Sequence, residues 1–410
     1  MTSLQELYTR FLGESVWEDF FGPGGQQDGM QHLDCLFYPQ KHGPAWRTTA
    51  CGGGRPDSAA ACLFDAIVRD AQGNLTLDPL RCADCESCRR ACEEGSLLES
   101  RDILPALDAV KRAEGLVYVL IAPAFLGQFS PQVTPGRLRT AFKALGFDGM
   151  IEVALFADVL TLKEALEFEK NIVDERDFQL ASCCCPMWIG MISKAYHELL
   201  PHVPGSVSPM IAAGRMVKRI HPDALTVFVG PCVAKKAEAK QPDVQGAVDY
   251  VLTFREVRDI FKAAGIRPEQ MEESEKDHSS RAGRIYACAG GVSEAVKATV
   301  ERLNPQRKIA IKTRRADGVP ACREMIEALR RGERDANFFE GMGCVGGCVG
   351  GPMAIIDAAG AAANVAHYGE DAAYRTPLDN PYVFALLRRL GIHTVEQLLE
   401  EEDIFGRIFA

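Results

Sequence analysis

The sequence contains no run that approaches about 18 uninterrupted apolar residues, so it offers no candidate transmembrane helix. Residues 1–11, MTSLQELYTRF, lack a basic segment followed by an apolar run, so no signal peptide is expected. An excess of positive charge is also absent: the formal net charge is −10, which argues against nucleic acid as a main partner. Together these absences predict a cytoplasmic protein without membrane contact, in which a disulfide framework is not expected.

The chain does have cysteine, and its distribution is uneven. Of 15 cysteines in 410 residues, seven lie from Cys35 to Cys92 and eight from Cys183 to Cys348, with none in between. This gap predicts two domains, 1–110 and 111–410, joined by a helix within SRDILPALDAVKRAEG at 100–115. Without disulfides, so many thiols indicate metal ligands, catalytic groups or small buried residues.

The strongest local motif is RCADCESCRRAC at 81–92, with the spacing C-x2-C-x2-C-x3-C. This spacing is typical of bacterial ferredoxins, in which three closely spaced thiolates and one distant thiolate bind a [4Fe–4S] cluster. We therefore predict one cluster bound by four thiolates: Cys62, Cys82, Cys85 and Cys88. A zinc site is the alternative, although zinc sites usually have two cysteine pairs rather than a run of four.

For a second N-terminal cluster, the remaining cysteines supply only three of the four thiolate ligands. The remaining cysteines there are Cys35, Cys51 and Cys92. His32 or His42 would complete the set, since imidazole replaces thiolate at some iron–sulfur centres, or both are simply loop residues. The sequence thus predicts one or two [4Fe–4S] clusters in this part.

From residue 116 onward, short apolar runs alternate with amphipathic stretches, the pattern of an α/β domain. The Val, Ile and Phe content of the runs favours strands at 116–123, 150–156, 178–182, 225–230, 248–254, 308–313 and 337–341. A helix is predicted at 158–172, and short helices are expected in the C-terminal segment from residue 379.

Three of the predicted strands lead into cysteine. The segments are SCCCP at 182–186, VGPC at 229–232 and GMGCVGGC at 341–348. Ligands in open α/β sheets bind outside the carboxyl ends of strands, so these segments are expected to converge on one site. One thiol from each of the first two segments and both thiols of the last make four, enough for a cubane; buried structural cysteine is the alternative for any single segment.

These residues resemble a known family. CCPMW at 184–188, PCVAK at 231–235 and EGMGCVGGC at 340–348 resemble the three signature motifs of [FeFe]-hydrogenases, and the first motif resembles that of the group B branch. The resemblance extends from Ile121 onward. It implies an α/β, two-lobed catalytic domain preceded by a ferredoxin-like α+β iron–sulfur domain that relays electrons.

The resemblance also implies roles. The cubane of the H-cluster would be held by Cys185, Cys232, Cys344 and Cys348. Cys348 would also bridge to a di-iron subsite that carries CO, cyanide and an azadithiolate. Cys184 would carry protons and Lys235 would bond a cyanide, with Met342 packed beside the di-iron unit. The backbone of Ala122, Pro123 and Ala124 would meet the other cyanide.

Two carboxylates match the family's proton path. Glu164 and Glu167 are separated by three residues on the predicted helix, and their spacing to the double cysteine matches the family. Taken alone, such a pair usually marks a solvated helix face.

The sequence departs from the prototypical motifs at four places. Cys183 replaces a serine, Gly230 replaces a methionine, and the relay serine falls on Pro204. The glycine tract after the third motif is shortened to residues 350–352. The absent methionine is expected to leave space that water or Cys183 fills, and the outer proton path is expected to be altered or to use water.

The resemblance implies the reversible oxidation of H2 to protons and electrons. Its implied partners are an electron carrier such as ferredoxin and the hydrogenase maturation proteins. Two other functions are weighed: an iron–sulfur assembly or scaffold protein, and a sensor of H2 or redox state. Cys184, Lys235 and Met342 have no role at a bare cubane, which favours the enzyme over the scaffold. Sensors usually carry an added signalling domain, for which the sequence has no candidate segment.

Overall fold

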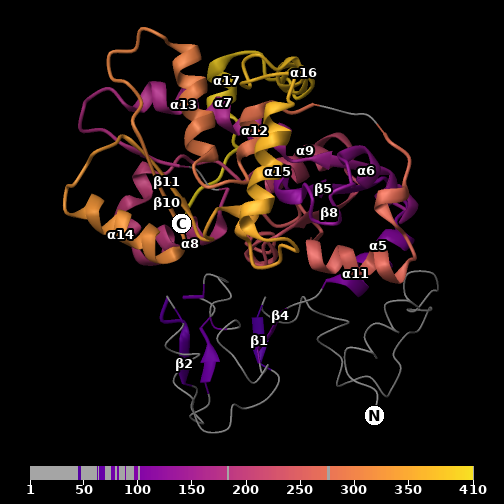
Figure 1. Cartoon of the computed structure of the whole chain (residues 1–410). Coiled ribbons are helices and arrows are strands. Elements are labelled where there is room, and N and C mark those ends of the chain that lie inside the picture. The colour runs from indigo at the N-terminus through magenta and orange to yellow at the C-terminus, as the bar shows by residue number, and fades with distance from the viewer. Residues whose placement is uncertain are drawn as a thin grey trace.

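The computed structural model describes residues 102–181, 184–274 and 278–409. In the N-terminal part it describes 45–47, 62, 64–69, 75–78, 81–82, 88 and 97–99. Figure 1 shows helices and strands mixed throughout the part that follows residue 102, with the short N-terminal strands below it. None of the described helices is both long and apolar enough to span a membrane.

A four-stranded parallel sheet forms the first lobe. Its order is β6-β5-β8-β9, from strands β5 (Val117–Ile121), β6 (Gly149–Glu152), β8 (Leu225–Gly230) and β9 (Tyr250–Thr253). The central strands β5 and β8 are almost wholly buried, which explains their continuous Val, Ile, Leu and Phe content. The strands predicted at 116–123, 225–230 and 248–254 are confirmed.

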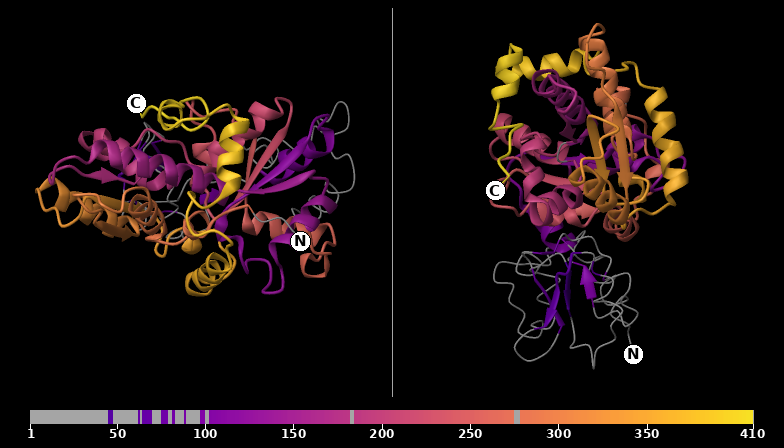
Figure 2. Two further views of the ribbon diagram at one scale, coloured as in Figure 1. Left: turned by 90° about the horizontal axis from the view of Figure 1, so that it is seen from above. Right: turned by 90° about the vertical axis from the view of Figure 1, so that its left-hand side faces the viewer.

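A separate three-stranded parallel sheet forms the second lobe. Its order is β10-β11-β7, from β7 (Gln179–Leu180), β10 (Thr313–Asp317) and β11 (Phe338–Met342). Its core is centred on Trp188, Phe338 and Phe339, each at most 1% exposed. Figure 2 shows the two sheets in different halves of the molecule, so the predicted α/β two-lobed fold is confirmed.

Helices cover both sheets. The longest is α7 (Ala154–Asn171), which packs against α9, α12 and α13 and so runs between the lobes. The other described helices are α5 (Ile103–Arg112), α6 (Pro135–Ala144), α8 (Pro186–Ala195), α9 (Pro209–Ile220), α10 (Ala234–Glu238), α11 (Phe254–Ala263), α12 (Arg281–Ile285), α13 (Gly291–Leu303), α14 (Val319–Arg330), α15 (Ala358–Glu370), α16 (Pro381–Arg389) and α17 (Val395–Glu400). The predicted helix at 100–115 and the short C-terminal helices are therefore present.

Two strand predictions were wrong in part. Of 308–313 only Thr313 belongs to a strand. The reason is that the Asn337 side chain hydrogen-bonds the backbone of the preceding residues. Its Oδ1 accepts from the N–H of Lys312 at 2.8 Å, and its Nδ2 donates to the carbonyl of Ala310 at 3.0 Å. Of 150–156, the strand ends at Glu152 and helix α7 starts at Ala154. Short apolar runs do not distinguish a buried strand from a buried helix turn.

The described N-terminal strands form two antiparallel pairs. β1 (Ala45–Arg47) pairs with β4 (Leu97–Glu99), and β2 (Ile67–Arg69) with β3 (Leu75–Leu77). The ferredoxin-like assignment of this part and the boundary between 110 and 111 stay predictions. Two described contacts join it to the second lobe: Lys194 Nζ, at the end of α8, donates to the carbonyl of Cys82 at 2.5 Å, and Phe64 packs against the core of that lobe.

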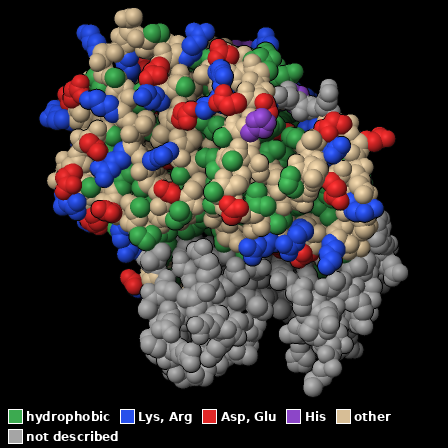
Figure 3. Space-filling view, viewed as in Figure 1, with side chains coloured by type: hydrophobic (Ala, Val, Ile, Leu, Met, Phe, Trp, Pro, Cys, Tyr) green, Lys and Arg blue, Asp and Glu red, His purple; other side chains and the backbone are tan. Residues whose placement is uncertain are grey.

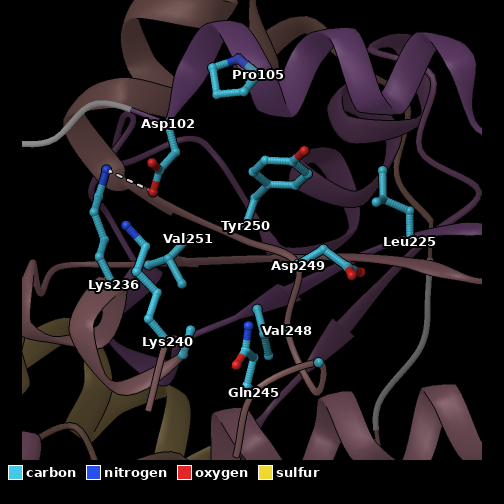
Figure 4. A pocket seen from close by; sticks show the side chains of 12 residues that line it. Asp102, Pro105, Leu225, Lys236, Lys240, Gln245, Val248, Asp249, Tyr250 and Val251 are labelled. Atoms are coloured by element: carbon cyan, nitrogen blue, oxygen red, sulfur yellow. Dashed lines mark ion pairs between the residues drawn. The ribbon is translucent and has the colours of Figure 1, made fainter. Parts of the chain in front are cut away.

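A buried ion cluster joins the start of α5 to the first lobe. Lys236 on α10 is about 1% exposed, and its Nζ lies 2.9 Å from Glu256 Oε1 and 3.5 Å from Asp102 Oδ2. Lys236 and Asp102 also line a pocket of about 440 Å³ at β9, and Figure 4 shows their ion pair at one side of it, with Tyr250 between them and Leu225. The lysine thus balances two carboxylates that are both largely removed from water.

We expect Lys236→Met to destabilise the protein by about 3–5 kcal/mol, because it leaves two buried carboxylates without their cation. Burial already raises the pKa of Glu256, and the Lys236 ammonium opposes that rise. Without the lysine this pKa rises further, so the folded variant holds a proton that the unfolded chain releases as the pH increases. The loss of stability relative to wild type is therefore expected to be largest near neutral pH and smaller in acid. Urea unfolding at several pH values measures this; a pH-independent loss would contradict it.

Candidate active site

The three cysteine segments meet at the carboxyl ends of strands from both sheets. Cys184 and Cys185 follow β7, Cys344 follows β11 in the same sheet, and Cys232 follows β8 in the other sheet. The expected convergence is present, but it joins two sheets rather than one. Pro186 stands at the first position of α8, where a helix needs no backbone donor, so Cys185 immediately precedes the helix.

Four of these thiols form what we call the thiol centre: Cys184, Cys185, Cys232 and Cys348. Burial, together with the neighbouring charges of Cys185 and Cys348, raises the pKa of Cys232 far above its ordinary value. Burial and Cys185 raise the pKa of Cys348 to about 12. Burial, then Cys348 and Cys185, raise the pKa of Cys184 as well. Thiols that disfavour one another's ionisation lie close together. By exposure Cys185 is buried, and the other three are half-buried.

Backbone contacts connect the motifs around the thiol centre. The N–H of Gly343, next to Cys344, donates to Cys185 Sγ at 3.3 Å. Gly341 must be glycine, because a Cβ there would lie 2.0 Å from the indole ring of Trp188. The tryptophan of the first motif is thus packed directly on the strand that carries the third. Cys344 itself is half-buried against the same core.

Two glycines of the third motif are required by their backbone conformation and by close backbone neighbours. Gly346 and Gly347 have φ of +81° and +88°, a region that favours glycine. A Cβ at Gly347 would also lie 2.6 Å from the backbone nitrogen of Ala289. The close neighbour of Gly347 among the described residues is the segment that contains Cys288 and Ala289.

Lys235 is on α10, three residues after Cys232 of the thiol centre. Its Nζ lies 2.6 Å from Glu238 Oε2, and both side chains are at most 8% exposed. Burial lowers the pKa of Lys235, but Glu238 and the thiols Cys232 and Cys184 outweigh burial, so the pKa is raised and the ammonium persists. Since an ammonium has three N–H donors, the pair with Glu238 leaves donors for an anionic group in the site.

The segment predicted to meet the di-iron unit follows β5 in the first lobe. Ala122 N donates to the carbonyl of Val229 on β8 at 2.9 Å, and Pro123 and Ala124 begin a 3₁₀ turn, Pro123–Phe125. Met342 is the last residue of β11 and is 1% exposed. Ala122 and Met342 therefore lie at the carboxyl ends of strands from opposite lobes.

The sequence predicted open space beside Gly230. This prediction was wrong for the position that the Cβ atom of a larger residue would take. A Cβ there would lie 2.7 Å from the Phe228 ring and 3.3 Å from the Cβ of Ala122. Phe228 and Gly230 are two residues apart on β8 and so face the same side of the sheet. The Phe228 ring, rather than an open space, takes the place of the absent side chain.

Glu164 and Glu167 do not lie on a solvated face. Glu164 is fully buried, and the Glu167 side chain is 14% exposed. Glu167 Oε1 pairs with Lys163 Nζ at 2.6 Å, and Lys163 Nζ lies 3.4 Å from Ser206 Oγ. Burial raises the pKa of Glu167 even though Lys163 opposes the rise. The solvated-face alternative therefore fails for this pair.

Several predicted ligands lie outside the described residues. These are Cys35, Cys51, Cys85 and Cys92, with the histidines His32 and His42. Cys183, which was not predicted as a ligand, lies outside them as well. Of the described N-terminal thiols, Cys62 Sγ accepts from the N–H of Ala66 at 3.2 Å, Cys88 is buried, and Cys82 contacts Lys194 as given above. The N-terminal cluster assignment stays a prediction.

Sequence reasoning missed six residues near the site. Glu238 was signalled only by its i, i+3 spacing from Lys235, and Ser206 only by its closeness to Pro204. Tyr286 and Thr161 carried no local signal, because their hydroxyls meet across two helices 125 residues apart in sequence. Cys288 and Cys322 are further buried or half-buried thiols that no motif includes.

The donor set suits an iron–sulfur cubane. Soft thiolates are the preferred ligands of such clusters, and a backbone N–H already points at one of these sulfurs. Among the described residues, no three Cys, His, Asp or Glu side chains are grouped closely enough to hold one metal ion. A cubane does not need that, because each thiolate binds a different iron atom.

Two parallel α/β lobes with a thiol centre at their strand ends define an iron–sulfur protein of the iron-hydrogenase fold. Residues 116–352 match the family described as the iron only hydrogenase large subunit, C-terminal domain. The match covers more than half of the chain, so the chain belongs to this family. Membership implies iron–sulfur clusters.

Relatives of this chain include both enzymes and assembly proteins. It is 29% identical over 301 residues to Iron hydrogenase 1 of Clostridium pasteurianum, covering 60% of this chain and 52% of that one. It is 24% identical over 336 residues to Cytosolic iron-sulfur assembly component 3 of Pongo abelii, covering 66% and 70%. A solved structure of [FeFe]-hydrogenase HydA1 from Chlamydomonas reinhardtii aligns with a TM-score of 0.61 over 75% of this chain and 98% of that one, at 21% identity, which supports the fold alone. The chain spans about half the length of Iron hydrogenase 1.

Proposed function

We propose that this protein is an [FeFe]-hydrogenase that catalyses H2 ⇌ 2H⁺ + 2e⁻ at an H-cluster. The cubane is held by Cys185, Cys232, Cys344 and Cys348, and electrons pass through the N-terminal [4Fe–4S] clusters to a carrier such as ferredoxin. The observation that carries the proposal is the Lys235–Glu238 pair beside Cys184 in the thiol centre. A bare cubane has no use for a buried ammonium and a fifth thiol.

The residues of the chain prepare the site for this chemistry. When bound, the H-cluster supplies the redox chemistry of H2. Lys235 offers charge-assisted hydrogen bonds to an anionic ligand, while Glu238 keeps it charged and fixes its direction. Cys184 stands beside Lys235 and Cys348 and holds a proton at its sulfur. Burial of Lys235 and Glu238 keeps bulk water away from this ion pair.

The outer proton route runs along α7. Glu164 is buried, while Glu167, one turn further, is partly exposed. Pro204 has no hydroxyl, but Ser206 two residues later contacts Lys163, which pairs with Glu167. Glu167 Oε2 has no hydrogen-bond partner among the described residues, so it is available to a water molecule or an incoming proton. Lys163 and Ser206 therefore replace the missing serine.

We expect Cys82→Ala to slow electron delivery without harming the active site. Lys194 joins Cys82 to one end of α8, and Cys185 precedes the other end, about 14 Å away along the helix axis at 1.5 Å per residue. Turnover with reduced ferredoxin should fall steeply, while the infrared bands of the active site remain. Turnover with a small dye that reaches the active site directly should fall less; an equal loss with both donors would indicate misfolding.

Infrared spectroscopy of protein matured with the hydrogenase assembly enzymes tests the proposal. CO and cyanide stretches, together with H2 turnover, are expected. Resemblance to Cytosolic iron-sulfur assembly component 3 favours a second function, an iron–sulfur scaffold. Matured protein with cubane iron but without those stretches would support the scaffold and reject the hydrogenase.

A further inference from the structure

The loop of the third motif, residues 344–349, is bracketed by the segment 287–290. The carbonyl of Gly346 in this loop accepts from the N–H of Ala289 at 2.9 Å, and the N–H of the last loop residue donates to the carbonyl of Ala287 at 3.1 Å. The two bonds run in opposite directions, as in an antiparallel bridge. Because two of the proposed cubane ligands stand in this loop, their position depends on where the segment 287–290 lies.

One peptide group of that segment is fixed from both sides. The carbonyl of Ala289 accepts from Arg315 Nη1 at 3.0 Å, and the N–H of Gly290 donates to Glu340 Oε1 at 2.7 Å. These two backbone groups belong to the same peptide bond. Arg315 on β10 and Glu340 on β11 are paired in register, so their side chains leave the same face of the sheet. The peptide is therefore anchored to two adjacent strands and cannot rotate without losing both bonds.

Glu340 provides the stronger of the two anchors. It is 1% exposed, and its second oxygen, Oε2, accepts from the N–H of Ser293 in the first turn of α13 at 2.7 Å. The first N–H groups of a helix have no partner within the helix, and the N-cap of α13 is Gly290, which has no side chain to supply one. The carboxylate on β11 therefore does the work of a capping side chain, and its charge strengthens both bonds.

We propose that Glu340 and Arg315 are positioning residues for the cubane: by fixing the Ala289–Gly290 peptide they hold the loop 344–349 where its two thiols reach iron. This inference rests on the ligand set proposed above. Neither side chain binds iron or transfers a proton in this role. Cys348, the proposed bridge to the di-iron subsite, stands between the two bracketing bonds, so a shift of the segment changes the geometry of both subsites.

The test is Glu340→Gln in the full-length protein, first with reconstituted clusters and then after maturation. Glutamine has nearly the same shape, but its NH2 group faces one of the two N–H donors, so one bond is lost. The cubane should keep its iron while the paramagnetic spectrum of its reduced state changes. After maturation the CO and cyanide bands should broaden and shift, and H2 turnover should fall by about tenfold to a hundredfold.

The matched control is Glu256→Gln. Glu256 is likewise a buried carboxylate that accepts a backbone N–H at the start of a helix, that of Thr253 at 2.7 Å, but it belongs to the first lobe. Its replacement is expected to lower stability and to leave the cubane spectrum and the infrared bands unchanged. An equal spectral change in both variants would show that loss of stability, and not of position, is the cause.

Arg315→Met separates position from charge. Arg315 is exposed, so this variant should fold, and it decides the question alone if Glu340→Gln does not fold. Loss of either anchor releases the same peptide, so both variants should change the cubane spectrum in the same sense, with the smaller change in Arg315→Met. Charge alone would instead raise the reduction potential of the cubane in one variant and lower it in the other. Opposite potential shifts with unchanged spectral shape would overturn the proposal.

Failure of this inference and failure of the proposed function have different signatures. Wild-type protein that holds the cubane but shows no CO and cyanide bands after maturation would defeat the hydrogenase proposal, while the cubane spectra of the variants still decide the positioning role. Wild-type protein with those bands, combined with an unchanged cubane spectrum in both Glu340→Gln and Arg315→Met, would overturn the positioning role alone.

Discussion

Cys185→Ser is expected to abolish the cubane and, with it, H2 turnover. A serine hydroxyl is a hard, weakly acidic group and replaces a thiolate on iron poorly. The position is also constrained: Cys185 is 8% exposed, immediately precedes α8, and its sulfur accepts the N–H of Gly343. Serine therefore keeps the local fold but removes the ligand. Iron content, the paramagnetic signal of the reduced cubane and the CO and cyanide bands should all fall together.

The matched control is Cys322→Ser. Cys322 is fully buried, and its S–H donates to one at a time of two carbonyl oxygens, those of Ala316 and Met342, which lie 3.4 and 3.3 Å from the sulfur. A hydroxyl can make the same bonds, so cluster and activity should survive. If Cys185→Ser retained the cubane signal while Cys322→Ser lost it, the ligand set would be wrong.

Cys184→Ser is expected to have the opposite signature: intact clusters and almost no turnover. Serine holds its proton far more tightly than a thiol, whose ordinary pKa is about 8.5, so it is a poor proton carrier. Because Cys184 is not a ligand in this assignment, the reduced cubane signal and the CO and cyanide bands should persist while H2 turnover falls by orders of magnitude. Infrared spectra and turnover measured on the same samples provide the comparison.

The neighbouring variant Cys183→Ser sharpens this experiment. It restores the residue of the prototypical motif and should retain substantial activity, with changes mainly in rate or pH dependence. Normal turnover in Cys184→Ser together with an inactive Cys183→Ser would mean that the proton carrier is Cys183 and not Cys184.

Sequence patterns predicted the sheet of the first lobe well because its strands are continuous apolar runs. β5 and β8 were predicted almost to the residue, since buried parallel strands need apolar side chains on both faces. The run at 308–313 failed because a single side chain, Asn337, bonds the backbone there, and periodicity carries no such information. The residue composition of that run is typical of a strand, but part of its backbone is hydrogen-bonded to the side-chain amide of Asn337.

The candidate site was predictable where chemistry follows from local spacing and not where it depends on contacts across the fold. Cys185, Cys232, Cys344 and Cys348 stood in recognisable motifs, whereas the Tyr286 hydroxyl acquires its surroundings only when α12 packs on α7. The closure of the Gly230 position by Phe228 likewise depends on the side chain two residues earlier on the same strand face. Such contacts are tertiary, and no local pattern encodes them.

The surface provides little additional guidance to function. Figure 3 shows Lys and Arg side chains interspersed with Asp and Glu over most of the visible face of the described residues. Interspersed charges are typical of a solvated surface and do not select a partner by sign. The informative charges of this protein are the buried ones, Lys235 with Glu238 and Lys236 with Glu256.

The proposed cubane ligands come from two different sheets, so a bound cluster would be a covalent crosslink between the two lobes. Cys232 comes from the four-stranded sheet, and Cys185 and Cys344 come from the three-stranded sheet, while no strand is shared between the two. Iron–thiolate bonds that span this junction stabilise only the arrangement in which both lobes are folded and correctly docked. With these ligands, a bound cluster would therefore couple the stability of the two hydrophobic cores.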